Sequence, residues 1–117
     1  MTTSVLIVDD HPSFRATARM LLEAEGYAVV GEAPDGLSGI TAARELHPDL
    51  VLLDVNLPDL DGFDVAARLT NGSGPAVVLV SSRDSSDFGP LVARSGARGF
   101  ISKSDLSGAT LAALLQR

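Results

Sequence analysis

Residues 5–10 read Val-Leu-Ile-Val-Asp-Asp, four aliphatic side chains followed directly by two carboxylates. Residues 50–54 repeat this form and read Leu-Val-Leu-Leu-Asp. A short apolar run without polar alternation is typical of a strand covered on both faces. Acids that follow such strands lie at the carboxyl edge of a parallel sheet, where ligands bind. The two stretches therefore predict a buried parallel sheet with carboxylates along one edge.

Three further apolar runs continue the pattern, at residues 27–30, 77–80 and 99–101. Between the runs, apolar side chains recur at the spacing of one helix face, which predicts four helices. The four stripes are Phe14/Ala18/Leu21/Leu22, Gly39/Ile40/Ala43/Leu46, Phe63/Ala66/Leu69 and Leu106/Ala109/Ala113/Leu114. Pro90 predicts a short fifth helix before Gly96, because proline suits the first turn of a helix.

Strict alternation of strands and helices predicts an α/β fold, a doubly wound (βα)5 parallel sheet with right-handed crossovers. A chain of 117 residues is the length of one domain, and we find no linker within it. The last helical pattern runs to the end of the chain at Arg117. We therefore expect residues 1–117 to form a single domain, with no output domain in this chain.

The composition excludes several classes of function. The absence of cysteine excludes disulfides, a thiol nucleophile and cysteine-ligated metals. Fifteen acids against nine bases, with a net charge of -6, argue against direct binding to nucleic acid. No apolar run approaches the roughly 20 residues of a spanning helix. The first residues, Met-Thr-Thr-Ser, also lack the basic start of a signal peptide. We expect a soluble, cytoplasmic domain with no membrane contact.

Polar side chains follow four of the five predicted strands. Asp9 and Asp10 follow the first, Asp54 the third, Ser81 the fourth, and the single lysine, Lys103, the fifth. If those strands are neighbours, three carboxylates, a hydroxyl and an ammonium meet at one edge. Clustered carboxylates repel one another, and Mg²⁺, which prefers oxygen ligands, relieves that repulsion. A carboxylate beside Mg²⁺ and lysine can accept a phosphoryl group.

Four motifs in this order and spacing are specific to one family: residues 5–10, 54–62, 80–82 and 96–103. On them, essentially the whole chain resembles a bacterial response-regulator receiver domain, the phosphorylated module of two-component signalling. The resemblance implies a flavodoxin-like sheet of strand order 2-1-3-4-5. The run Lys103-Ser-Asp-Leu, with His11-Pro12 after the acidic pair, resembles receivers that precede helix-turn-helix domains. The family often has proline after the lysine, whereas this chain has Ser104.

The resemblance implies a role for each motif residue, with Mg²⁺ as cofactor. The implied roles are Asp54 as phosphoryl acceptor, Asp10 as a direct ligand of Mg²⁺, Asp9 as a ligand mainly through water, Asn56 as a ligand through its backbone carbonyl, Ser81 as switch hydroxyl, Lys103 as partner of the phosphoryl oxygens and Phe100 as aromatic switch.

The implied function is signalling rather than enzymatic turnover. A sensor histidine kinase would supply the phosphoryl group. Ser81 would then turn toward that group, and Phe100 would move inward into the vacated space. The surface of the fourth helix, fifth strand and fifth helix would change shape and control an output domain, an effector protein or homodimerisation.

Other polar residues have simpler interpretations. Asp59, Asp61 and Asp64 are expected to be loop and helix-start acids that complement helix dipoles. We interpret Glu32, Asp35 and Asp84 as solvated acids, and His11 and His47 as loop residues without metal-ligand spacing. Arg83, two residues after Ser81, is a candidate for controlling the access of water to a phosphoryl group.

Three other functions remain open on the sequence. A haloacid-dehalogenase-like phosphatase uses similar chemistry, but this chain lacks Asp-x-Asp after the first strand and a cap insertion. An atypical receiver would bind partners without phosphorylation, although the full set of acids, hydroxyl and lysine argues against it. A flavin-binding module of similar topology needs a phosphate loop after the first strand, where this chain has Asp-Asp-His-Pro.

Overall fold

The structure, a computed structural model, describes residues 2–72, 74–82 and 88–116. Within these residues one sheet of five parallel strands has the order β2-β1-β3-β4-β5, as expected. The strands are β1 (Ser4–Val8), β2 (Ala28–Ala33), β3 (Leu50–Asp54), β4 (Ala76–Ser81) and β5 (Gly99–Ser102). The predicted fold class, a flavodoxin-like doubly wound α/β sheet, is confirmed.

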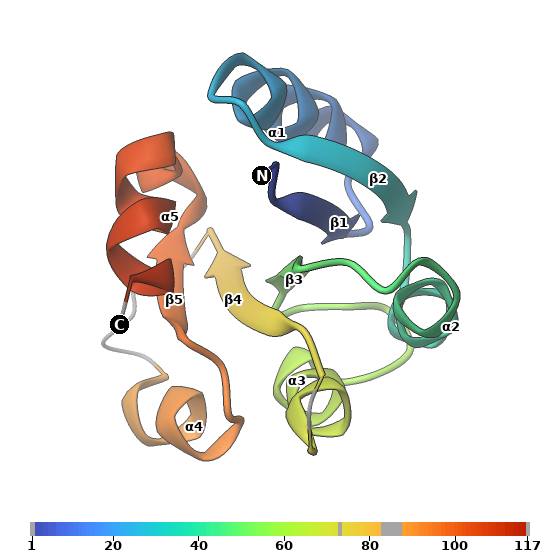
Figure 1. The fold of residues 1–117 in the computed structure, drawn as a ribbon. Helices are drawn as coiled ribbons and strands as arrows, with labels where there is room; N and C mark the ends of the chain where they lie inside the picture. Colours follow the sequence, from blue (N-terminus) through green and yellow to red (C-terminus); the bar gives the residue numbers. More distant parts are fainter. Residues whose placement is uncertain (1, 73, 83–87, 117) are drawn as a thin grey trace.

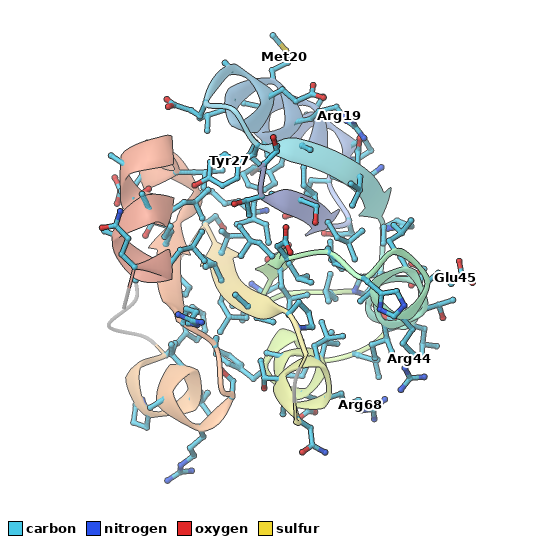
Figure 2. All side chains as sticks on the ribbon, viewed as in Figure 1. Arg19, Met20, Tyr27, Arg44, Glu45 and Arg68 are labelled. Atoms are coloured by element: carbon cyan, nitrogen blue, oxygen red, sulfur yellow. The ribbon has the colours of Figure 1, made fainter. Side chains whose placement is uncertain are left out.

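Helices cover both faces of the sheet (Figure 1). They are α1 (Pro12–Ala24), α2 (Gly36–Leu46), α3 (Gly62–Thr70), α4 (Gly89–Arg94) and α5 (Gly108–Leu115). Side chains of α1 and α5 pack on one face, and those of α2 and α3, with the segment around α4, pack on the other. The outer sides of these helices carry side chains that point away from the sheet, such as Met20 and Arg19 of α1 and Glu45 of α2 (Figure 2).

The three central strands explain the continuous apolar runs of the sequence. Residues 5–8, 50–53 and 77–80 are completely buried. Alternate side chains of β1 enter opposite cores: Leu6 and Val8 pack toward α2 and α3, whereas Val5 and Ile7 pack toward α1 and α5. Because both faces are covered, neither set of side chains can be polar.

The second strand continues through Ala33, because its backbone stays paired with β1 beyond the apolar run that ends at Val30. One predicted boundary was wrong. The last helix begins at Gly108 instead of near Leu106, which is buried in the core just before it. Ser107 accepts a hydrogen bond from the backbone N–H of Thr110 at 3.1 Å, and this cap sets the start of α5. The short helix with Pro90 in its first turn is confirmed.

The loop after β3 is tied to two helices by aspartates. Asp61 is the N-cap of α3 and accepts a 2.7 Å hydrogen bond from Phe63 N. Asp59 instead reaches α2, accepting hydrogen bonds from Gly36 N at 2.7 Å and Leu37 N at 2.9 Å. These backbone donors lower the pKa of the Asp59 carboxyl. The expected helix-start role is therefore confirmed for Asp61, while Asp59 serves a helix distant in sequence.

Replacing Asp59 with alanine is expected to lower the melting temperature, because two N–H groups at the start of α2 lose their acceptor. Asp64→Ala is a matched control, since Asp64 is an acid in the first turn of α3. Thermal unfolding followed by circular dichroism measures both variants. An equal fall in the two variants would contradict a specific role for the contact between Asp59 and α2.

Candidate functional site

The carboxyl edge of the sheet brings the predicted polar side chains together. Asp54 is the last residue of β3 and pairs in register with Val80 of β4. Ser81, the last residue of β4, pairs with Ser102 of β5, and Lys103 follows directly. Asp9 follows Val8, the last residue of β1, which pairs with Leu53. Neighbouring parallel strands that end at the same level therefore create the site.

Lys103 connects the two buried acids. Its Nζ lies 2.7 Å from Asp9 Oδ2 and 3.5 Å from Asp54 Oδ2. The side chains of Asp9 and Asp54 are only 1% and 3% exposed, so water cannot stabilise their negative charges, and the Lys103 ammonium stabilises them instead. The ammonium also lies 4.4 Å from the ring centroid of Phe14, a cation–π contact from α1. Lys103 is thus held between two carboxylates and an aromatic ring.

Asp54 has an unusual electrostatic environment. Burial raises the pKa of its carboxyl to about 6, and the nearby Asp9 carboxylate acts in the same direction. A 3.1 Å hydrogen bond from Asn56 N and the charge of Lys103 oppose this shift. A largely desolvated carboxylate beside an ammonium is suited to nucleophilic attack on a group whose negative charge that ammonium can stabilise.

The acidic cluster fits a hard divalent cation. One ligand atom from each of Asp9, Asp10, His11 and Asp54 lies within 4.8 Å of the others. Asp9 Oδ2 and Asp10 Oδ1 are buried and accept no hydrogen bond within the described part of the chain, although Lys103 forms an ion pair with the former. Carboxylate oxygens in this state are the ligands that Mg²⁺ prefers. Asn56, the remaining predicted ligand, lies in the adjoining loop two residues after Asp54.

His11 is the site residue that the sequence interpretation missed. It is the residue that precedes α1, and its ring enters the acidic cluster. Nδ1 is 3.0 Å from Asp9 Oδ1, 3.0 Å from Asp10 Oδ1 and 4.0 Å from Asp54 Oδ2. Its backbone N–H also donates to Asp9 Oδ1 at 2.8 Å. The sequence feature that could have placed His11 in the site is its position directly after the acidic pair, in the turn that leads into the helix.

Glu32 and Asp35 have structural partners instead of being merely solvated. Glu32 forms ion pairs with Arg15 at 3.1 Å and Arg19 at 2.8 Å, and these arginines lower the pKa of its carboxyl. Arg15 Nη1 also donates to the backbone carbonyl of Asp9 at 2.6 Å, which links this pair to the site. Asp35 caps α2 by accepting a hydrogen bond from Ser38 N.

An aromatic row extends from α3 to β5. The ring centroids of Phe63 and Phe88 are 5.5 Å apart, as are those of Phe88 and Phe100. Phe88 is buried just before α4, whereas Phe100 is half-buried on β5. Phe88 was not predicted, because the surrounding sequence has no regular apolar spacing. Arg83 and Asp84 lie outside the described residues.

The sequence matches the response regulator receiver domain family over residues 5–115. The chain belongs to this family. The receiver is 45% identical to BvgA of Bordetella pertussis over 104 residues, which cover 88% of this chain and 50% of that protein. It is 42% identical to the DNA-binding response regulator MtrA of Mycolicibacterium smegmatis, over 88% of this chain and 45% of MtrA.

The receiver also resembles solved structures along its whole length. A two-component response regulator of the LuxR family from Aurantimonas superimposes with a TM-score of 0.88 at 31% identity, covering 100% of this chain and 88% of that one. The receiver spans about half the length of BvgA and MtrA. No helix among the residues that the structure describes is long and apolar enough to cross a membrane.

Proposed function

We propose that the receiver accepts a phosphoryl group on Asp54 from the phosphohistidine of a sensor histidine kinase, in a reaction that depends on Mg²⁺. A carboxylate oxygen of Asp54 forms a bond to phosphorus as the phosphorus–nitrogen bond breaks, and the electron pair leaves with the imidazole. The product is an acyl phosphate on Asp54. The observation that carries the proposal is the buried Asp54 carboxylate, 3.5 Å from Lys103 and within the acidic cluster.

The other site residues would hold and neutralise the reacting group. Asp10, Asp54 and the backbone carbonyl of Asn56 would bind Mg²⁺ directly, and Asp9 would bind it mainly through water. The bound cation supplies charge neutralisation at the phosphoryl oxygens. Lys103, whose Nζ lies 2.7 Å from Asp9 Oδ2 and 3.5 Å from Asp54 Oδ2, would neutralise the same oxygens. The receiver is therefore a phosphoryl acceptor in signalling and not a turnover enzyme.

The acyl phosphate would change the shape of one surface. Ser81 turns to donate a hydrogen bond to the phosphoryl group, and Phe100 moves inward. These shifts favour one of two pre-existing conformations and alter the surface formed by α4, β5 and α5. That surface would control homodimerisation, an effector or an output domain. The names of the relatives, which include a transcription regulator and a DNA-binding response regulator, support a role in the control of transcription. We place this role in the cytoplasm and expect an output domain, and not residues 1–117, to bind DNA.

Intact mass spectrometry after incubation with acetyl phosphate and Mg²⁺ tests the proposal. The wild-type receiver should gain one phosphoryl group, and Asp54→Ala should gain none. Omitting Mg²⁺ and adding EDTA should abolish the gain in the wild type. An unchanged mass with Mg²⁺, or a gain that persists in Asp54→Ala, would show that Asp54 is not the acceptor.

A further inference from the structure

We propose that His11 is a nitrogen ligand of the cation site and shifts its preference from Mg²⁺ toward octahedral transition-metal ions, Ni²⁺ above all. The inference rests on the divalent-cation site of the proposed function. It concerns which ions that site binds, because none of the ligands assigned above is a nitrogen atom. The imidazole of His11 is already within the cluster, as its distances to three carboxylate oxygens show.

The position of Nδ1 fits one corner of an octahedron. Around an ion with donors at about 2.1 Å, neighbouring donors are about 3.0 Å apart and opposite donors about 4.2 Å apart. His11 Nδ1 lies 3.0 Å from one oxygen of Asp9, 3.0 Å from one oxygen of Asp10 and 4.0 Å from Asp54 Oδ2. Of the ligands that would bind directly, Asp10 Oδ1 matches a neighbouring donor and Asp54 Oδ2 an opposite donor around a single ion, while Asp9 would still bind mainly through water.

Asp9 Oδ1 accepts a 2.8 Å hydrogen bond from the backbone N–H of His11 and is hydrogen-bonded at 3.0 Å to Nδ1, and a bound cation would replace the second of these bonds. Lys103 forms its ion pair with Oδ2 of Asp9, whereas the His11 imidazole lies next to Oδ1 of the same carboxylate. Asp10 Oδ1, which is 3.0 Å from the imidazole, accepts no hydrogen bond among the described residues. The His11 side chain is 60% exposed, so an ion can reach the ring from solvent. A cation bound here would contact carboxylates on its inner side and the imidazole on its outer side.

The type of donor then decides which cations gain affinity. Carboxylates, carbonyls and water suit Mg²⁺, Ca²⁺ and Mn²⁺, whereas imidazole suits Ni²⁺, Cu²⁺ and Zn²⁺. Mg²⁺ gains little from exchanging a water for a nitrogen ligand. Ni²⁺ gains from the same exchange and accepts octahedral geometry, so His11 should strengthen Ni²⁺ binding while leaving Mg²⁺ binding nearly unchanged.

Calorimetric titration of the 117-residue chain with Mg²⁺ and Ni²⁺ tests the inference. His11→Ala should weaken Ni²⁺ binding by about tenfold or more, the size of effect typical for residues around a metal site. Its Mg²⁺ affinity should stay within a factor of about two, because Mg²⁺ does not depend on the nitrogen. His47→Asn is the matched control, since His47 ends α2 in a left-handed conformation that asparagine tolerates. It should leave both affinities unchanged.

Three outcomes would overturn the inference. Equal Ni²⁺ affinity in His11→Ala and the wild type would show that the imidazole is no ligand. A parallel loss of Mg²⁺ and Ni²⁺ affinity would show that His11 orients Asp9 instead of binding the ion. A wild-type chain that binds neither ion would contradict both the His11 ligand and the cation site of the proposed function. A chain that binds Mg²⁺ normally but gains no Ni²⁺ affinity from His11 would contradict the His11 ligand alone.

A spectroscopic measurement is independent of any variant. Zn²⁺ is diamagnetic, so a ¹⁵N spectrum of the wild-type chain can be recorded with this ion bound. The Nδ1 resonance of His11 should move to the range of a metal-bound nitrogen, while both ring nitrogens of His47 stay in place. A His11 resonance that does not respond to Zn²⁺ would also overturn the inference.

Discussion

Alanine in place of Gly62 is expected to destabilise the receiver by about 3 kcal/mol, at the upper end of the usual cost of overpacking. A Cβ atom at this position would overlap the carbonyl oxygen of Asp54 and would lie 2.6 Å from Cα of Val55 and 2.8 Å from the carbonyl oxygen of Val55. All three are backbone atoms, so no side-chain rotation relieves the contact. The segment that carries Asp54 must move, and phosphoryl uptake should fall together with stability.

Gly31→Ala is the matched control for this prediction. A Cβ atom there would meet the end of the Leu46 side chain at 2.8 Å. Leu46 is 44% exposed and can turn aside, so the cost should be small. Urea unfolding measures the free energy of both variants, and intact mass after acetyl phosphate treatment measures uptake. Similar stability of the two variants would contradict the close approach of Gly62 to the segment that bears the acceptor.

Asparagine in place of Asp54 is expected to stabilise the metal-free receiver at pH 7 by an amount on the order of 2 kcal/mol. Burial raises the pKa of the Asp54 carboxyl from 3.8 to about 6, so the folded protein binds more protons than the unfolded chain between these values. Wild-type stability therefore falls as the pH rises through this window and remains lower above pH 6. The asparagine amide carries no charge, so the variant does not lose the free energy that burying an ionised carboxylate costs the wild type.

Urea unfolding in EDTA at several values between pH 4 and pH 7 measures the effect. The difference in unfolding free energy between Asp54→Asn and the wild type should grow across this range. Asp64→Asn changes the charge equally at an exposed position in α3 and should show no such growth. A constant difference, or an asparagine variant that is less stable at pH 7, would contradict the electrostatic cost assigned to Asp54.

The sequence predicted the sheet well because its strands are buried on both faces. Residues 5–8, 50–53 and 77–80 must be continuously apolar, and this pattern is visible without coordinates. The apolar run of β2 is shorter than the strand itself for the opposite reason. Its final residues stay in the sheet through backbone pairing with β1, and the exposed side of an edge strand does not need apolar side chains.

The candidate site was predictable to the extent that its residues end strands. Asp9, Asp54, Ser81 and Lys103 follow that rule, and parallel topology brings them together. Contacts that depend on side-chain direction were not predictable. The imidazole of His11 could equally have faced solvent, and the Asp59 carboxylate could have capped α3 nearby instead of α2. The approach of Phe88 to Phe100 depends on the path of the chain before α4.

The ion pairs of Lys103 also determine how far the electric field of the cation site extends when a cation is bound. Three carboxylates and one ammonium leave the cluster with two net negative charges, which one divalent cation cancels. A cluster neutralised in this way projects little field beyond a Debye length of about 8 Å. The receiver with the cation bound would therefore exert little long-range attraction or repulsion on an approaching kinase or output domain. Recognition by such a partner would depend on the positions of atoms at the receiver surface.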